Sequence, residues 1–262
     1  MTEIPLLPRS LRSRRLAICV LAGALAAGLR AGPPFLTDDP DPVDLNHWEF
    51  YIFGQGDSTN NYDAINGPAI EMNYGIALNT QLHLIAPLAS FSSIGTGWAS
   101  GYGDTEVGVK YRFLAETATL PEIGIFPLAE LPTGDSSRGL GNGRTWYRLP
   151  VWLQKSWGPW TSYGGGGAAL NSAPGQRNSG FAGWLVQRDL GKYLTLGTEL
   201  FWQGADAGGG PGSTLANFGG SVNFTEKFNL LFSAGRALSG ERHTVWYLGL
   251  YWTGGPDKPD KK

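Results

Sequence analysis

The sequence predicts an all-β protein, a single transmembrane antiparallel up-and-down β-barrel of about twelve strands. Three observations predict it. Short alternating segments run from Trp48 to Trp252, tight turns alternate with longer polar or Gly-rich stretches between them, and the charged residues share a strand face with glycines. Small and polar residues inside, with aliphatic and aromatic residues outside, are typical of an outer-membrane barrel and the reverse of a soluble one.

The connections between segments set the strand count. Tight turns are expected at residues 78–80, 115–120, 156–159, 189–192 and 225–227. Longer stretches fall at 57–64, 92–102, 133–143, 171–178, 204–212 and, shorter, 239–241. If the tight turns face the periplasm and the long loops face outward, the barrel closes with an even number of strands and both termini periplasmic.

The chain divides into four expected regions. Residues 1–31 read as a secretory signal peptide, because several arginines precede an apolar run at 16–29 that ends in small residues. An N-terminal periplasmic segment is expected at 32–46, the barrel at 47–253 and a polar C-terminal tail at 254–262. Asp38, Asp39 and Asp41 lie among prolines without the spacing of a calcium loop, so they are expected to be turn residues rather than metal ligands.

Composition excludes several functions. Cleavage after residue 31 leaves 15 basic and 21 acidic residues, so the mature chain is acidic and nothing indicates nucleic-acid binding. The single cysteine, Cys19, lies in the signal peptide, which excludes disulfides and cysteine metal sites in the mature protein. Only 16% of residues are charged, against about 25% in a typical soluble domain.

Strand alternation identifies the residues expected inside the barrel. In the segment 105–114, Val107, Val109 and Tyr111 oppose a charged and glycine-bearing face. The candidate lumen-lining residues are Glu71, Glu106, Lys110, Arg112, Glu122, Arg148, Trp152 and Glu199. Both charge signs occur, so these residues could form the walls of a solute path or neutralise one another and close a narrow interior, and the sequence leaves both open.

Aromatic residues cluster near the ends of the expected strands. Rings at these positions suit the two membrane interfaces, where the polar edge of tyrosine or tryptophan meets the headgroups. The residues are Trp146, Tyr147, Trp157, Trp160, Phe201, Trp202, Trp246, Tyr247, Tyr251 and Trp252.

No residues indicate catalysis or a cofactor. His83 lies between Leu82 and Leu84 and is therefore expected to point inward, with no serine at strand spacing to complete a nucleophile pair. We expect no enzyme activity, no cofactor and no metal.

Several stretches resemble a known family. Gly32-Pro-Pro-Phe-Leu-Thr-Asp-Asp-Pro40 followed by His47-Trp-Glu-Phe-Tyr51, Gly103-Asp-Thr-Glu-Val-Gly-Val-Lys-Tyr-Arg112, and Pro127-Leu-Ala-Glu-Leu-Pro-Thr-Gly-Asp135 are similar to bacterial outer-membrane proteins grouped as the meta-pathway phenol-degradation family, often labelled transporter. The resemblance implies a barrel that passes small solutes, aromatic or apolar ones among them.

The expected function is therefore passive passage of small solutes across the outer membrane of a Gram-negative bacterium. The expected partners are outer-membrane lipid, the barrel-assembly machinery and a small-molecule solute. The alternative is a non-conducting structural or adhesive barrel, and a more distant alternative is an outer-membrane lipid hydrolase.

Overall fold

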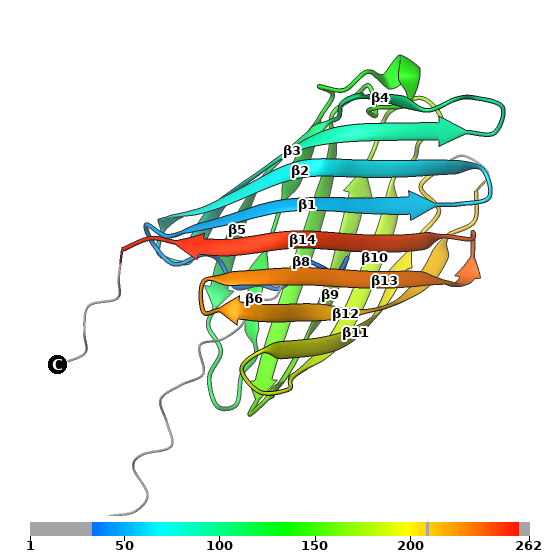
Figure 1. Cartoon of the computed structure of the whole chain (residues 1–262). Helices are drawn as coiled ribbons and strands as arrows, with labels where there is room; N and C mark the ends of the chain where they lie inside the picture. The colour runs from blue at the N-terminus through cyan, green and yellow to red at the C-terminus, as the bar shows by residue number, and fades with distance from the viewer. Residues whose placement is uncertain (1–32, 208–209, 257–262) are drawn as a thin grey trace, which may run out of the picture. The chain divides into compact units, whose positions relative to one another are not determined.

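The computed structural model describes residues 33–207 and 210–256, which form a closed antiparallel barrel (Figure 1). The expected signal peptide and most of the expected tail lie outside the described residues. The strands are β1 (Trp48–Ser58), β2 (Tyr62–Ala77), β3 (Thr80–Ser93), β4 (Ala99–Tyr102), β5 (Thr105–Leu114), β6 (Glu122–Ile125), β7 (Leu128–Leu131), β8 (Trp146–Trp157), β9 (Trp160–Leu170), β10 (Ser179–Asp189), β11 (Leu194–Gln203), β12 (Ser213–Thr225), β13 (Phe228–Gly240) and β14 (Thr244–Gly254).

Two of the twelve strands of the barrel are interrupted. β4 and β5 both pair with β3, one after the other, and β6 and β7 both lie between β5 and β8. Counting each broken strand once gives twelve, which confirms the predicted fold class. β14 closes the barrel against β1 over its full length, from Trp48 opposite Gly254 to Ser58 opposite Thr244.

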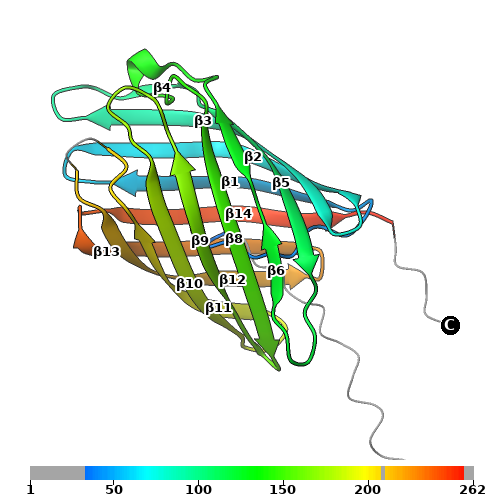
Figure 2. The ribbon, with the colours of Figure 1, turned by 180° about the vertical axis from the view of Figure 1, so that it is seen from behind.

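The two ends of the barrel differ as the sequence predicts. Short connections follow β2, β8, β10 and β12, and we call this the turn end; it also holds the start of β1 and the end of β14 (Figures 1 and 2). The longer connections that follow β7, β9 and β11 begin and end at the other end of the barrel, the loop end. The loop expected at 57–64 is much shorter, because Asp57 pairs with Ala64 and Ser58 with Asp63.

Glycines and prolines explain the irregular places. Pro68 lies within a register shift between β2 and β3, and Pro127 occupies the break between β6 and β7. The run 164–167 consists of four glycines, so sequence alternation assigns it to neither face, and in the structure it is regular strand. Its glycines leave room for two indoles, since a Cβ at Gly164 would overlap Trp184 and one at Gly165 would meet Trp152.

The remaining secondary structure is slight. A single turn of 3₁₀ helix, Ser136–Arg138, forms in the loop between β7 and β8, and Asp135 caps its N-terminus. Within residues 33–207 and 210–256 no helix is long and apolar enough to cross a membrane.

Candidate functional site

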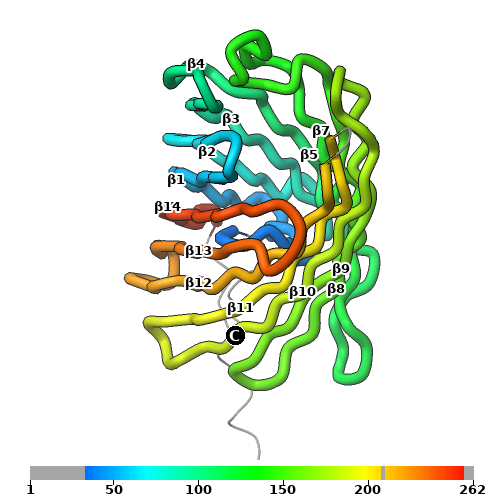
Figure 3. The backbone as a smooth tube through the Cα atoms, turned by 90° about the vertical axis from the view of Figure 1, so that its right-hand side faces the viewer, coloured from blue at the N-terminus to red at the C-terminus, as the bar shows by residue number. Residues whose placement is uncertain are grey.

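The candidate site is the barrel lumen, and the N-terminal segment runs through it. Residues 33–47, which we call the strap, lie between the wall formed by β1 and β14 and the opposite wall (Figure 3). Thr37 and Asp39 are fully buried, and Val43 is 2% exposed. The sequence predicts an N-terminal periplasmic segment at 32–46 and indicates no contacts for it; in the structure these residues, from 33 on, pack inside the barrel.

Acidic residues of the strap pair with basic residues of β5. Lys110 Nζ lies 3.0 Å from Asp38 Oδ1 and 3.3 Å from Asp39 Oδ1, and Arg112 Nη1 lies 2.7 Å from Asp41 Oδ1. Burial raises the pKa of Asp39 well above its usual range, and the nearby Lys110 ammonium is the main group that opposes this rise. The aspartates that the sequence suggested as turn residues are therefore the charges that hold the strap to the wall.

Glu199 holds the strap on the other side of the lumen. Its carboxylate accepts hydrogen bonds from the backbone N–H groups of Thr37, at 2.5 Å, and Leu36, at 3.3 Å, and from Asn217 Nδ2 at 2.5 Å. Glu199 is 1% exposed, so these donors satisfy a buried carboxylate that would otherwise be costly. Hydrogen bonds to a charged group contribute about 1.5–3 kcal/mol each, which makes Glu199 a strong anchor.

Further contacts fix the strap along its length. Val43 N–H donates to Gln81 Oε1 at 2.8 Å, and the Ser233 hydroxyl donates to the Pro34 carbonyl at 2.5 Å. Glycines make room for its backbone: a Cβ at Gly183 would overlap Thr37 Oγ1, and one at Gly75 would overlap the Asp44 carbonyl. The strap is thus held by β3, β5, β11 and β13 and crosses the lumen from wall to wall.

The sequence-predicted residues all lie on the inward strand faces, in three groups. Lys110, Arg112 and Glu199 hold the strap, with Glu122 Oε1 3.5 Å from Arg112 Nη1. Glu71 and Glu106 belong to a network around His83, described next. Arg148 and Trp152 belong to an aromatic cluster on the loop-end side of the strap.

His83 is the centre of a buried polar network. Its Nδ1 lies 2.7 Å from Asn73 Oδ1 and 3.6 Å from Glu71 Oε1, and its Nε2 lies 3.0 Å from Glu106 Oε1. Phe126 packs edge-on against the imidazole, with ring centroids 5.2 Å apart. His83 therefore points inward and is surrounded by carboxylates and an amide, which is not the serine–histidine arrangement of a lipid hydrolase.

An aromatic cluster lines the lumen on the loop-end side of the strap, and most of its members were not predicted from the sequence. Its buried members are Phe126, Trp152, Phe181, Phe201 and Leu215. Arg148 stacks on the Phe181 ring, with its guanidinium carbon 4.5 Å from the centroid, and Lys110 Nζ lies 4.9 Å from the Phe126 centroid. Cations over aromatic faces are favourable, so the cluster presents apolar surface next to positive charge.

The prediction that all terminal aromatics lie at the membrane interfaces was wrong for three residues. Phe201, Tyr247 and Tyr251 are 2%, 7% and 9% exposed and point into the barrel. Tyr251 donates to Glu49 Oε1 at 3.0 Å and stacks on Tyr51, so its hydroxyl has a partner in the lumen. Strand alternation alone would have placed all three inside, because Glu199 and Gly249 share their faces.

Sequence comparisons do not assign this chain to a family. No family model matches the sequence, and no curated protein matches it either. The resemblance to the phenol-degradation family therefore stays a prediction.

Solved structures are similar over most of the chain. The COG4313 outer membrane channel from Pseudomonas putida F1 is 17% identical, with a TM-score of 0.71 over 82% of this chain and 98% of that one. The KdgM porin is 12% identical, with a TM-score of 0.54 over 77% and 98% of the two chains. The translocator domain of the autotransporter NalP from Neisseria meningitidis is 14% identical, with a TM-score of 0.51 over 78% and 88%. At these identities, the likeness establishes the barrel fold and nothing finer.

Proposed function

We propose that this protein is a channel of a Gram-negative outer membrane that lets small solutes pass by diffusion. The observation that carries the proposal is the closed barrel with polar and charged residues inside and apolar side chains such as Leu200, Phe218 and Leu248 exposed outside. A membrane barrel needs that inversion, and a wet interior gives solutes a path. Two of the similar structures are a channel and a porin, which supports the proposal.

The strap limits what passes. It crosses the lumen at the level of Lys110 and Glu199 and occupies space that a barrel of about this size would otherwise leave to water and solute. Flux is therefore low, and large hydrophilic solutes are excluded. Movement of the strap would widen the path.

The lumen walls indicate the solute class. Phe126, Trp152, Phe181 and Phe201 offer flat apolar surfaces, and Arg148 and Lys110 lie over two of these rings. A small aromatic or apolar molecule that bears a polar group matches such a surface better than a sugar does. This is the solute class that we propose.

Swelling of liposomes that contain the detergent-refolded mature protein tests the channel. We expect swelling in small solutes and none in large oligosaccharides, with heat-dependent gel mobility as the check that the barrel is folded. Replacing Arg112 and Arg148 together should shift ion preference in planar bilayers toward cations, because Lys110 is then the one basic residue left among the predicted lumen-lining residues, beside Glu71, Glu106, Glu122 and Glu199. Unchanged selectivity would remove both arginines from the path.

The second candidate function is a barrel that conducts nothing and serves a structural role. The fastening of the strap by Lys110, Arg112 and Glu199 favours it, since a permanent plug would be held in this way. Folded protein that produces no swelling in any solute and no bilayer current would select this candidate over the channel.

A further inference from the structure

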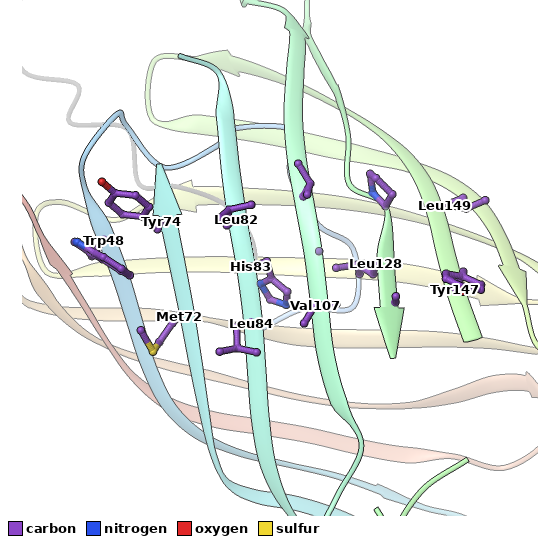
Figure 4. A pocket seen from close by; sticks show the side chains of 14 residues that line it. Trp48, Met72, Tyr74, Leu82, His83, Leu84, Val107, Leu128, Tyr147 and Leu149 are labelled. Carbon is purple, nitrogen blue, oxygen red and sulfur yellow. The ribbon is translucent and has the colours of Figure 1, made fainter. Parts of the chain in front are cut away.

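An apolar groove crosses the outer wall of the barrel over β1, β2, β3, β5, β7 and β8. It has a volume of about 660 Å³. Figure 4 shows Trp48, Met72 and Tyr74 at one side of it and Tyr147 and Leu149 at the other. Between them lie Leu82 and Leu84 of β3 and then smaller outward residues, Val107, Val109, Pro127 and Ala129, so the groove is hollowed where β5 and β7 carry short side chains.

The backbone beneath the groove is weakly paired. Val109 N–H donates to the Pro127 carbonyl at 3.1 Å, and Phe126 N–H donates to the Pro150 carbonyl at 3.4 Å. Neither proline has an N–H to donate in return, so each pair keeps one ladder hydrogen bond where two other residues would make two. The break between β6 and β7 lies at the same place. Fewer hydrogen bonds therefore have to break for the strands to separate here than elsewhere in the wall.

The aromatic cluster lies directly behind this part of the wall. Phe126 belongs to the cluster and Leu128 packs against it, and Leu128 and Gly108 also line the groove outside. Gly108 has no side chain to fill the gap, and a Cβ there would overlap Leu128 Cδ2. Apolar surface inside and apolar surface outside are thus separated by one weakly paired strand.

The strap closes the axial route below the cluster. Phe181 lies two residues nearer the loop end than Gly183 on β10, and Phe201 lies two residues nearer it than Glu199 on β11; Gly183 and Glu199 both contact the strap. A solute that enters from the loop end and rests on the cluster therefore meets the strap in the axial direction and the thin wall at its side.

We infer that small apolar or aromatic solutes pass between the lumen and the membrane through the wall at Gly108, Phe126 and Pro127, with the outer groove as their binding site on the membrane side. This inference rests on the proposed channel function and adds a lateral route to it. Polar solutes gain nothing from an apolar groove and keep to the axial route past the strap. The two solute classes should therefore respond differently to changes in the wall.

Filling the groove is the first test. Val107→Trp with Ala129→Trp places two indoles in it, and the control Leu200→Trp with Leu248→Trp places two indoles at outward positions of β11 and β14 that do not line the groove. Porin-deficient cells with intact lipopolysaccharide express each chain, and uptake of labelled naphthalene and labelled arabinose is measured. We expect naphthalene uptake to fall by about fivefold or more in the filled variant only, because the solute loses its site, while arabinose uptake stays at the parent level.

A reversible cross-link is the second test and uses one protein in two states. Gly108→Cys with Leu128→Cys places two thiols at paired positions of β5 and β7, where a disulfide would pin the wall. The sequence holds one other cysteine, Cys19, in the expected signal peptide. Oxidation should abolish the naphthalene uptake that the chain supports and reduction should restore it, with arabinose uptake equal in both states.

The outcomes separate the lateral route from the channel itself. Naphthalene uptake that is unchanged by filling and by the cross-link, or that falls in the same proportion as arabinose uptake, overturns the lateral route and leaves the channel standing. In that case the groove holds lipid chains only. Absence of uptake of both probes by cells with the folded parent chain overturns the channel and the lateral route together.

Discussion

Removing the Lys110 ammonium should release the strap, and the size of the effect depends on Asp39. In Lys110→Met, the fully buried Asp39 loses the cation that lies 3.3 Å away. Leaving one partner of a buried ion pair unpaired costs about 3–5 kcal/mol. Instead of staying charged and unpaired, Asp39 can bind a proton. Protonating a carboxyl with a pKa of about 3.9 costs roughly 4 kcal/mol at pH 7.

Proton binding by Asp39 therefore limits the free-energy cost of docking the strap in Lys110→Met and makes that cost depend on pH. Burial raises the pKa of Asp39 in the docked state, so docking is favoured below this pKa and weakens as the pH rises through it. At pH 5 protonation of a free carboxyl costs only about 1.5 kcal/mol. In the variant, the equilibrium constant for docking of the strap should fall by about two to three powers of ten at pH 7 and by about one power of ten at pH 5.

Planar-bilayer recordings at the two pH values measure this directly. Lys110→Met should conduct more than the parent at pH 7, and the difference should shrink at pH 5. Lys110→Met with Asp39→Asn removes the ammonium and the fully buried carboxylate and leaves the partly exposed Asp38 without that ammonium, so it should lie closer to the parent than Lys110→Met does at pH 7. Lys155→Met, which removes an amine 3.0 Å from Glu116 at the turn end, is the control. Equal conductance of Lys110→Met and parent at both pH values would refute the role of this pair.

Three further perturbations follow from the contacts. Gly183→Ala places a methyl group against the strap and should raise conductance several-fold, with heat-dependent gel mobility unchanged. Conductance at the parent level would contradict the close packing of Thr37 against Gly183. The hydrogen bond that the protonated His243 ring donates to the Asp57 carboxylate raises the pKa of His243 above its usual value, so this pair stabilises the loop end at low pH, by about 1 kcal/mol or less, and the stabilisation is lost as the pH rises. Asp57→Asn should bring the His243 titration seen by NMR back toward 6.5, and an unmoved titration would contradict this account. Asp104→Ala removes the carboxylate that accepts hydrogen bonds from the backbone N–H groups of Gly134, at 2.9 Å, and Asn142, at 2.6 Å. Tryptic cleavage after Arg138 in this loop should become faster by at least about tenfold. An unchanged rate would show that the loop does not depend on Asp104.

The strand plan could be predicted from the sequence because it depends on local signals. Alternation with a period of two identifies faces, and glycine, proline and asparagine mark turns, so the order and number of strands follow without tertiary information. Asn79, for example, adopts a positive φ of 59° in the tight turn expected at 78–80. The glycines at 164–167 defeated this reasoning, since their role depends on Trp152 and Trp184 from neighbouring strands.

The strap could not be predicted, because its contacts join residues far apart in the sequence. Nothing in the spacing of Asp38 and Asp39 shows that Lys110 lies opposite them, and a proline-rich acidic stretch is equally compatible with a free segment. Alternation predicts that Glu199 points inward, and it does not show what fills the space in front of it. The same holds for the aromatic cluster, whose buried members come from four different strands and the break between β6 and β7.

The most direct measurement is single-channel recording of the mature, heat-modifiable parent protein in a planar bilayer. A barrel narrowed by a docked strap should give small discrete current steps, with rare larger ones when the strap leaves the lumen. Folded protein that gives no current above that of the bare lipid, across both polarities and a wide range of salt concentrations, would contradict the channel and favour a permanently closed structural barrel.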